Sequence, residues 1–123
     1  MIDISQANST AGELMVTSII NAVWKMAEKS TLGVTKLIVF VDELNKYAPR
    51  EGYSPIKEIL LDVAERGRSL GVILIGAQQT ASEVERRIIA NSSIRVVGRL
   101  DSAEASREEY GFLPSVHRTR ATI

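Results

Sequence analysis

The sequence has no cysteine and a single histidine, His117, among its 123 residues. The absence of cysteine excludes disulfide bonds, zinc–thiolate sites and thiol catalysis, and it favours a reducing compartment, so we expect a cytoplasmic protein. One histidine offers no pair of imidazoles for a metal site. Fifteen basic side chains balance fifteen acidic ones, which leaves no electrostatic case for nucleic-acid binding by this chain alone. The longest unbroken apolar run has five residues, at 37–41, whereas a membrane-spanning helix needs about 20, so we expect no membrane segment.

What the sequence does contain is an alternation of short apolar runs with helical patterns. Residues 37–41 form a continuous apolar run and residues 72–77 a similar run that includes Gly76, and both are typical of strands buried on both faces of a parallel sheet. Residues 2–4 resemble the end of another strand, and residues 94–97 alternate in part, as a strand nearer an edge does. Helices are predicted at 10–29, 54–70, 82–90 and 101–110. This order predicts a single α/β domain over residues 1–123, with a parallel sheet of about four strands and flanking helices.

Capping residues predict where three of these helices begin. Thr10 and Glu13 have the spacing of a capping box, in which the hydroxyl accepts from the glutamate amide and the glutamate reaches back. Ser82 and Glu85 form a second such pair. Asp101 is placed to cap the last predicted helix.

Polar side chains directly follow the two longest predicted strands. Asp42 and Glu43 come after residues 37–41, and Gln78 comes after residues 72–77. Ligands of parallel sheets bind beyond the carboxyl ends of the strands, and Mg²⁺ is held by one or two carboxylates together with waters and phosphates. An apolar strand followed by Asp-Glu is the pattern of the second nucleotide motif of P-loop ATPases, in which the aspartate orients Mg²⁺ and the glutamate polarises the attacking water. A helix cap or a surface acidic pair for Asp42 and Glu43, and an ordinary loop residue for Gln78, are the alternatives.

An arginine-glycine-arginine segment precedes the second of these strands. Gly67 lies within a helical pattern at a cost of about 1 kcal/mol relative to alanine, which indicates a close approach of another backbone. The flanking Arg66 and Arg68 point to different faces, and an arginine projecting from the rim of the domain can enter a neighbouring subunit's site and neutralise phosphate charge. Surface arginines paired with nearby carboxylates are the alternative.

Several of these segments together resemble the C-terminal half of the HerA/FtsK superfamily of hexameric DNA-pumping ATPases, most closely the HerA-like helicases. The resemblance runs over nearly the whole chain. The order and spacing of the matching segments carry it, more than any single motif does. These segments are residues 37–44, Ala48-Pro49, residues 66–71, Gly76-Ala77-Gln78 and residues 93–96.

The resemblance implies a partial RecA-like P-loop NTPase core and a role for each matching residue. It implies that Asp42 coordinates Mg²⁺, that Glu43 is the catalytic base and that Gln78 is the polar sensor at the strand end. It implies that Arg68 is offered in trans to the adjacent subunit, with Arg66 as the second choice. The cofactors implied for the complete protein are ATP and Mg²⁺, and the implied partners are DNA, further copies in a homo-oligomer of six, and a nuclease.

One departure from the family pattern concerns the phosphate loop. No G-x-x-x-x-G-K-[ST] motif occurs in the 123 residues, so the chain has no loop of backbone amides and lysine to cradle the phosphates. In the family this loop lies upstream of the matching segment, and we therefore expect the chain to be part of a longer polypeptide. The alternative is a non-catalytic α/β interaction domain with a degenerate NTPase fold.

The missing loop has a consequence for the sheet. In the family the phosphate-loop strand lies between the strand that precedes Gln78 and the strand matched by residues 94–97. Without it, residues 94–97 have no neighbour on one side. We therefore expect that strand to be displaced, to pair with residues 72–77, or to be completed by another chain.

Overall fold

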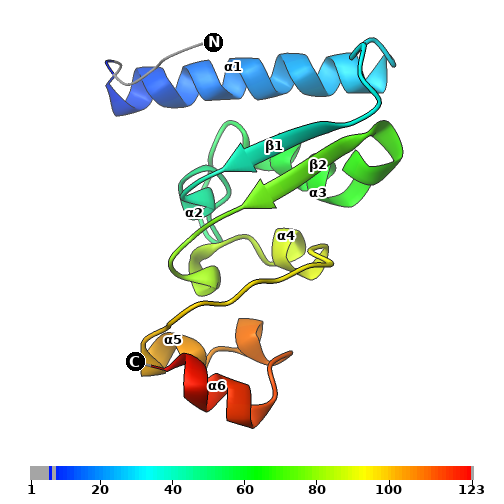
Figure 1. Cartoon of the computed structure of the whole chain (residues 1–123). Coiled ribbons are helices and arrows are strands. Elements are labelled where there is room, and N and C mark those ends of the chain that lie inside the picture. The colour runs from blue at the N-terminus through cyan, green and yellow to red at the C-terminus, as the bar shows by residue number, and fades with distance from the viewer. Residues whose placement is uncertain (1–5, 7, 123) are drawn as a thin grey trace.

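The computed structural model describes residue 6 and residues 8–122, which form a mixed α/β structure around a small parallel sheet (Figure 1). The predicted strand at residues 2–4 lies outside the described residues. No helix in the described part of the chain is long and apolar enough to cross a bilayer. The elements, in chain order, are α1 (Ser9–Glu28), β1 (Leu37–Val41), α2 (Leu44–Tyr47), α3 (Lys57–Leu70), β2 (Val72–Gly76), the 3₁₀ turn η1 (Ala81–Glu83), α4 (Arg86–Ala90), α5 (Ser102–Ala105), the 3₁₀ turn η2 (Glu108–Tyr110) and α6 (Ser115–Ala121).

The first helix is confirmed to within a residue at each end, but its cap is a different residue from the predicted one. The Asn8 side chain accepts a hydrogen bond from the Ala11 amide at 2.8 Å, so Asn8, and not Thr10, is the N-cap. Asparagine and threonine both cap helices well, and the cap lies two residues earlier than predicted. Trp24 and Ala27 of α1 are buried against Val63 of α3 and Val72 of β2.

Strands β1 and β2 pair in parallel, with Leu37 opposite Val72 and Val41 opposite Gly76. Helix α3 connects them and ends at Gly71, whose φ of 77° is the left-handed conformation that favours glycine at this position. The two predicted strands, the helix between them and its glycine terminator are therefore confirmed, although the helix begins at Lys57, three residues after its predicted start at residue 54.

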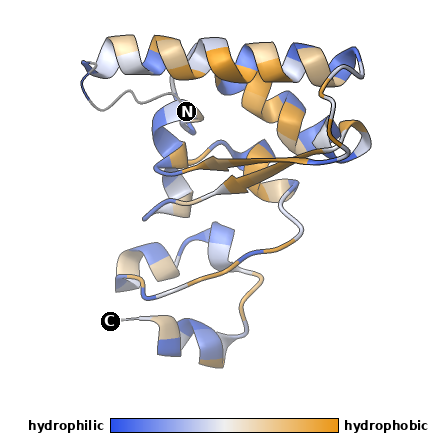
Figure 2. Ribbon diagram, turned by 45° about the horizontal axis from the view of Figure 1, so that its top comes forward, coloured by the Kyte–Doolittle hydropathy of each residue, from blue (hydrophilic) through white to orange (hydrophobic). Residues whose placement is uncertain are grey.

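The sheet is covered on one face only. Val39 and Leu74 point into the core that α1 and α3 build, and Figure 2 shows both helices on the same side of the strands. On the other face the large apolar side chains are exposed. They are Ile38, Phe40, Ile73 and Ile75, with between 40% and 64% of their surface accessible. The prediction that both strands are buried on both faces is therefore wrong for the described chain.

Two strands, and not four, are present in the described residues. Residues 94–97 belong to no strand, and Ile94 and Val96 are 87% and 93% exposed. Just beyond them an isolated parallel bridge joins Leu100 to Thr122. Figure 1 shows this segment on the β2 side of the sheet, leading to α5 and α6. Because no strand lies beside residues 94–97 to bond their backbone, a strand-forming sequence remains outside the ladder.

Candidate functional site

The carboxyl ends of β1 and β2 lie side by side. The Ala77 amide donates to the Val41 carbonyl at 2.9 Å, and the Leu44 amide donates to the Ala77 carbonyl at 3.0 Å. With Val41 paired to Gly76, the chain continues into Asp42 and Glu43 after β1 and into Ala77 and Gln78 after β2. The fold thus brings the three strand-end residues predicted from sequence to one edge of the sheet.

The acidic pair forms a tight turn with an unusual backbone conformation. Glu43 has φ 51° and ψ 52°, the left-handed region that costs a residue with a side chain about 1–2 kcal/mol. The Asp42 carboxylate accepts a hydrogen bond from the Glu43 amide at 2.9 Å, and the next residue, Leu44, is buried in the core. Core packing after the turn therefore holds Glu43 in a conformation of the kind that clusters at functional sites.

Both carboxylates of this turn are available to a ligand. Asp42 and Glu43 are exposed, and neither forms an ion pair with any residue that the structure describes. No group of three metal-ligating side chains gathers anywhere in residues 8–122. One or two carboxylates of this kind can hold a magnesium ion that takes its other ligands from water and phosphate oxygens.

Gln78 leaves a polar atom without a partner. Its side-chain oxygen is shielded from solvent and has no hydrogen-bond partner in the described chain. Gln78 also lines a groove of about 610 Å³, which extends from Gly76 along residues 94–100. A buried acceptor with no donor destabilises the fold by about 1–3 kcal/mol, so a donor from a ligand or another segment would be favourable here.

The two arginines lie at the opposite end of the sheet. Arg66 and Arg68 occupy the last turns of α3, which lead to the start of β2, and a strand of five residues separates them from the acidic turn by about 16 Å. Arg66 contacts Glu28 at 3.4 Å and Asp62 at 3.8 Å, and its guanidinium lies 5.5 Å from the Trp24 ring centre. Arg68 is exposed and forms no ion pair within the described part of the chain. A single chain therefore does not bring either arginine to the acidic turn, and of the two, Arg68 is free to reach a neighbour.

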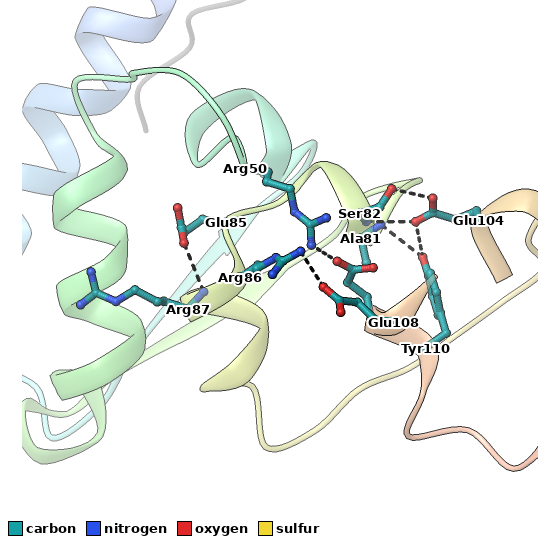
Figure 3. A network of polar contacts seen from close by, with 10 residues as sticks. Arg50, Ala81, Ser82, Glu85, Arg86, Arg87, Glu104, Glu108 and Tyr110 are labelled. Atoms are coloured by element: carbon teal, nitrogen blue, oxygen red, sulfur yellow. Dashed lines mark hydrogen bonds and ion pairs between the residues drawn. The ribbon is translucent and has the colours of Figure 1, made fainter. Parts of the chain in front are cut away.

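Sequence reasoning missed the residues that hold the loop after β2. The Glu104 carboxylate accepts hydrogen bonds from the Ser82 amide at 3.0 Å, the Ser82 hydroxyl at 2.6 Å and the Tyr110 hydroxyl at 3.0 Å. The Tyr110 oxygen in turn accepts from the Ala81 amide at 3.2 Å (Figure 3). This set, which we call the Glu104 clamp, ties the η1 turn to the C-terminal segment.

The start of the C-terminal segment was predictable, but the clamp was not. Asp101 caps α5 through the Glu104 amide at 2.9 Å, as the sequence predicts. The helix expected at 101–110 nevertheless ends at Ala105, and the 3₁₀ turn η2 follows it. The helix expected at 82–90 is instead η1 followed by α4, whose N-cap is Glu85. Ser82 does not cap a helix because its hydroxyl donates to Glu104, a contact across 22 residues that no local pattern indicates.

Two ion pairs lie beside the clamp. Arg50, in the loop after α2, pairs with the buried Glu109, and Arg86 of α4 pairs with Glu108 at 2.6 Å (Figure 3). The Arg50–Glu109 pair is largely buried, whereas the Arg86–Glu108 pair is exposed and contributes little. The contacts place the α5–η2 region against both loops that follow the strands.

The clamp predicts opposite responses to acid and to alkali. Burial opposes ionisation of Glu104, but hydrogen bonds from Ser82 and Tyr110 outweigh it and hold the pKa of this carboxyl below its ordinary value of 4.5. Burial, together with the Glu104 charge, raises the pKa of Tyr110 above its ordinary value of 10.0. Glu104 therefore stabilises the fold above about pH 4.5 and loses this effect as the pH falls further, whereas Tyr110 stabilises it below about pH 10 and loses this effect as the pH rises.

Urea unfolding across this pH range measures both responses. The difference in unfolding free energy between wild type and Glu104→Gln should shrink from about pH 6 to about pH 3, and Tyr110→Phe should lose stability less steeply than wild type above about pH 10. If the difference in unfolding free energy between wild type and each variant did not change with pH, the clamp would be contradicted.

A comparison of the sequence with protein-family models finds no match, and a comparison with curated proteins finds none either. This edge of the sheet carries two carboxylates on a strained turn and an amide oxygen on the adjacent strand end, and none of these has a partner among the described side chains.

Proposed function

We propose that this chain is the distal half of the ATPase domain of a DNA translocase or helicase of the HerA/FtsK type. The observation that carries the proposal is the pairing of β1 with β2, because it sets the Asp42-Glu43 turn beside Gln78 at the carboxyl edge of a parallel sheet. That edge is where ligands bind in open α/β sheets. Hydrolysis of a nucleoside triphosphate needs a metal ligand, a group that orients water and a contact to the γ-phosphate, and these three residues have the matching chemistry.

In this proposal each residue has one task. Asp42 holds Mg²⁺, which when bound neutralises charge that develops on the phosphates. Glu43 accepts a hydrogen bond from the attacking water and then its proton, and Gln78 donates from its amide nitrogen to the γ-phosphate or to that water. Arg68, at the other end of the strands, serves the site of the adjacent subunit in a homo-oligomer, which we propose to be a hexamer that acts on DNA.

The phosphate loop is proposed to come from polypeptide outside these 123 residues. The residues that flank β2 bond to β1, through the Gly71 carbonyl and the Ala77 amide. Alternate residues of a parallel strand bond to the same neighbour, so the backbone amides of Leu74 and Gly76 face the free edge of β2. The groove of about 610 Å³ begins at Gly76 on this edge, with residues 94–100 on its far side. A strand that enters the groove parallel to β2 would end beside Gln78 and deliver its following loop to the acidic turn. A helix after that loop would cover the exposed face of Ile38, Phe40, Ile73 and Ile75.

Hydrogen exchange read at single amides tests this placement. In the chain alone, the Leu74 and Gly76 amides should exchange much faster than those of Ile73 and Ile75, which bond to β1. In the full natural polypeptide that contains the chain, all four amides should be protected, because a new strand takes up the free edge. Unchanged, rapid exchange of Leu74 and Gly76 in the full polypeptide would show that no strand pairs there.

The function itself is tested by ATP turnover. The full natural polypeptide should hydrolyse Mg²⁺-ATP, and duplex DNA should raise the rate. A polypeptide that neither binds nor hydrolyses the nucleotide, with or without DNA, would reject the proposal and favour a non-catalytic α/β interaction domain.

A further inference from the structure

We propose that Glu83 is a positioning residue that sets the acidic turn against the Gln78 strand end, an inference that rests on the function proposed above. One oxygen of its carboxylate, Oε2, accepts two hydrogen bonds. The Thr80 hydroxyl donates at 2.9 Å and the Asn45 side-chain amide donates at 3.3 Å. Thr80 lies two residues after Gln78, and Asn45 lies two residues after Glu43. The Glu83 side chain therefore bridges the segments that carry the two halves of the candidate site.

Backbone contacts fix where Glu83 itself lies. Its carbonyl accepts from the Arg50 amide at 2.8 Å, and the next residue, Val84, forms an antiparallel bridge with Pro49. From the other side, the Glu104 clamp holds the preceding residue, Ser82, through both its amide and its hydroxyl. Because η1 is held from both sides, the turn cannot move to compensate for the loss of the Glu83 carboxylate.

The bridge is one of several ties between the two loops, and it lies near the acidic turn in sequence. Beside the turn, the Leu44 amide bonds to the Ala77 carbonyl, and farther along the loops the Arg50 amide bonds to the Glu83 carbonyl and the Glu85 amide bonds to the Ala48 carbonyl. Glu43 occupies a left-handed conformation that the chain does not favour by itself, and Asn45 belongs to the short α2 that follows it. A tether from Asn45 to Thr80 therefore opposes relaxation of Glu43 away from Gln78, and misplacement of such groups slows the chemical step more than it weakens binding.

Substitutions at Glu83 separate a positioning role from a structural one. In the full natural polypeptide, Glu83→Ala should lower kcat for ATP roughly tenfold while KM for ATP stays within about twofold. Glu83→Gln should restore kcat, because its amide oxygen accepts from the same hydroxyl and the same amide. Glu108→Ala is the control, since Glu108 is an exposed glutamate that pairs with Arg86 and contacts neither strand end.

A readout without activity keeps this inference distinct from the proposed function. In the chain alone, Glu83→Ala should speed exchange of the Leu44 amide at least tenfold relative to wild type and to Glu83→Gln, since the bond to Ala77 opens more often. If wild type lacked ATP turnover but Leu44 exchange followed this pattern, the proposed function would fail and the bridge would stand. Three results would each overturn the inference. They are a wild-type exchange rate of the Leu44 amide in Glu83→Ala, a wild-type kcat in Glu83→Ala, and an equal loss of kcat in the alanine and glutamine variants.

Discussion

Glu43→Gln is expected to lower ATP turnover by the full natural polypeptide about 100-fold or more, while bound nucleotide is retained. Glutamine keeps the size of glutamate and its hydrogen-bonding oxygen, but it cannot take the proton of the attacking water. Proton transfer by a positioned side chain contributes about 10²–10⁴-fold to rate, and that factor is what the substitution removes. Asp42 remains in place to hold Mg²⁺, so the ATP affinity should change little.

Steady-state turnover and equilibrium nucleotide binding, measured on the same preparation, check this expectation. Glu58→Gln is the matched control, because Glu58 is an exposed glutamate on α3 with no ion pair among the described residues. Its turnover should equal that of wild type. Turnover by Glu43→Gln at the wild-type rate would show that Glu43 is not the base, even if the rest of the site were correct.

The second large effect is expected at Gly67 and concerns the packing of α3 on β2. A Cβ atom at Gly67 would lie 2.5 Å from the Val72 carbonyl oxygen, a backbone atom that cannot move aside without shifting β2. Helix propensity alone favours alanine over glycine by about 1 kcal/mol. Overpacking of this kind costs about 1–3 kcal/mol and sometimes more, so we expect Gly67→Ala to be destabilising on balance and Gly67→Val to lose about 3 kcal/mol.

Urea unfolding of the chain, with the slope of the transition compared between variants, measures this series. Ser69→Ala provides the control, since Ser69 is exposed on the same helix and two residues away. It should be neutral or slightly stabilising. If Gly67→Ala raised the unfolding free energy by about the 1 kcal/mol that propensity predicts, the close approach of α3 to β2 would be refuted.

The close approach at Gly67 was itself predictable from sequence, as were the elements around it. A glycine in a helical pattern has little reason to be there unless another backbone lies near, and here that backbone belongs to Val72. The same local logic placed Gly71 at the end of α3 and Asp101 at the start of α5. Each of these features depends on a few neighbouring residues, so each can be predicted from the sequence alone.

The pairing of β1 with β2 was also predicted, but other long-range contacts were not. Residues 94–97 have strand-forming side chains, but a strand exists only where another backbone supplies its hydrogen bonds, and none does among the described residues. The apolar residues on both faces of β1 and β2 predict burial on both faces, yet α1 and α3 cover only one. The Glu104 clamp was invisible for a related reason, since its partner Ser82 lies 22 residues away.

For the candidate site, the division is similar. The sequence by itself determined which residues follow each apolar run, and therefore that Asp42, Glu43 and Gln78 emerge at strand ends. The order of strand, helix and strand also predicted that the two ends lie side by side, and the parallel pairing of β1 with β2 confirms it. Only the tertiary structure decided that Glu43 adopts a left-handed backbone and that both arginines lie at the far end of the sheet. The physical reason is that side-chain spacing encodes local conformation and the order of elements, whereas the conformation of a turn and the distance between side chains depend on which backbone groups and apolar faces find partners elsewhere in the fold.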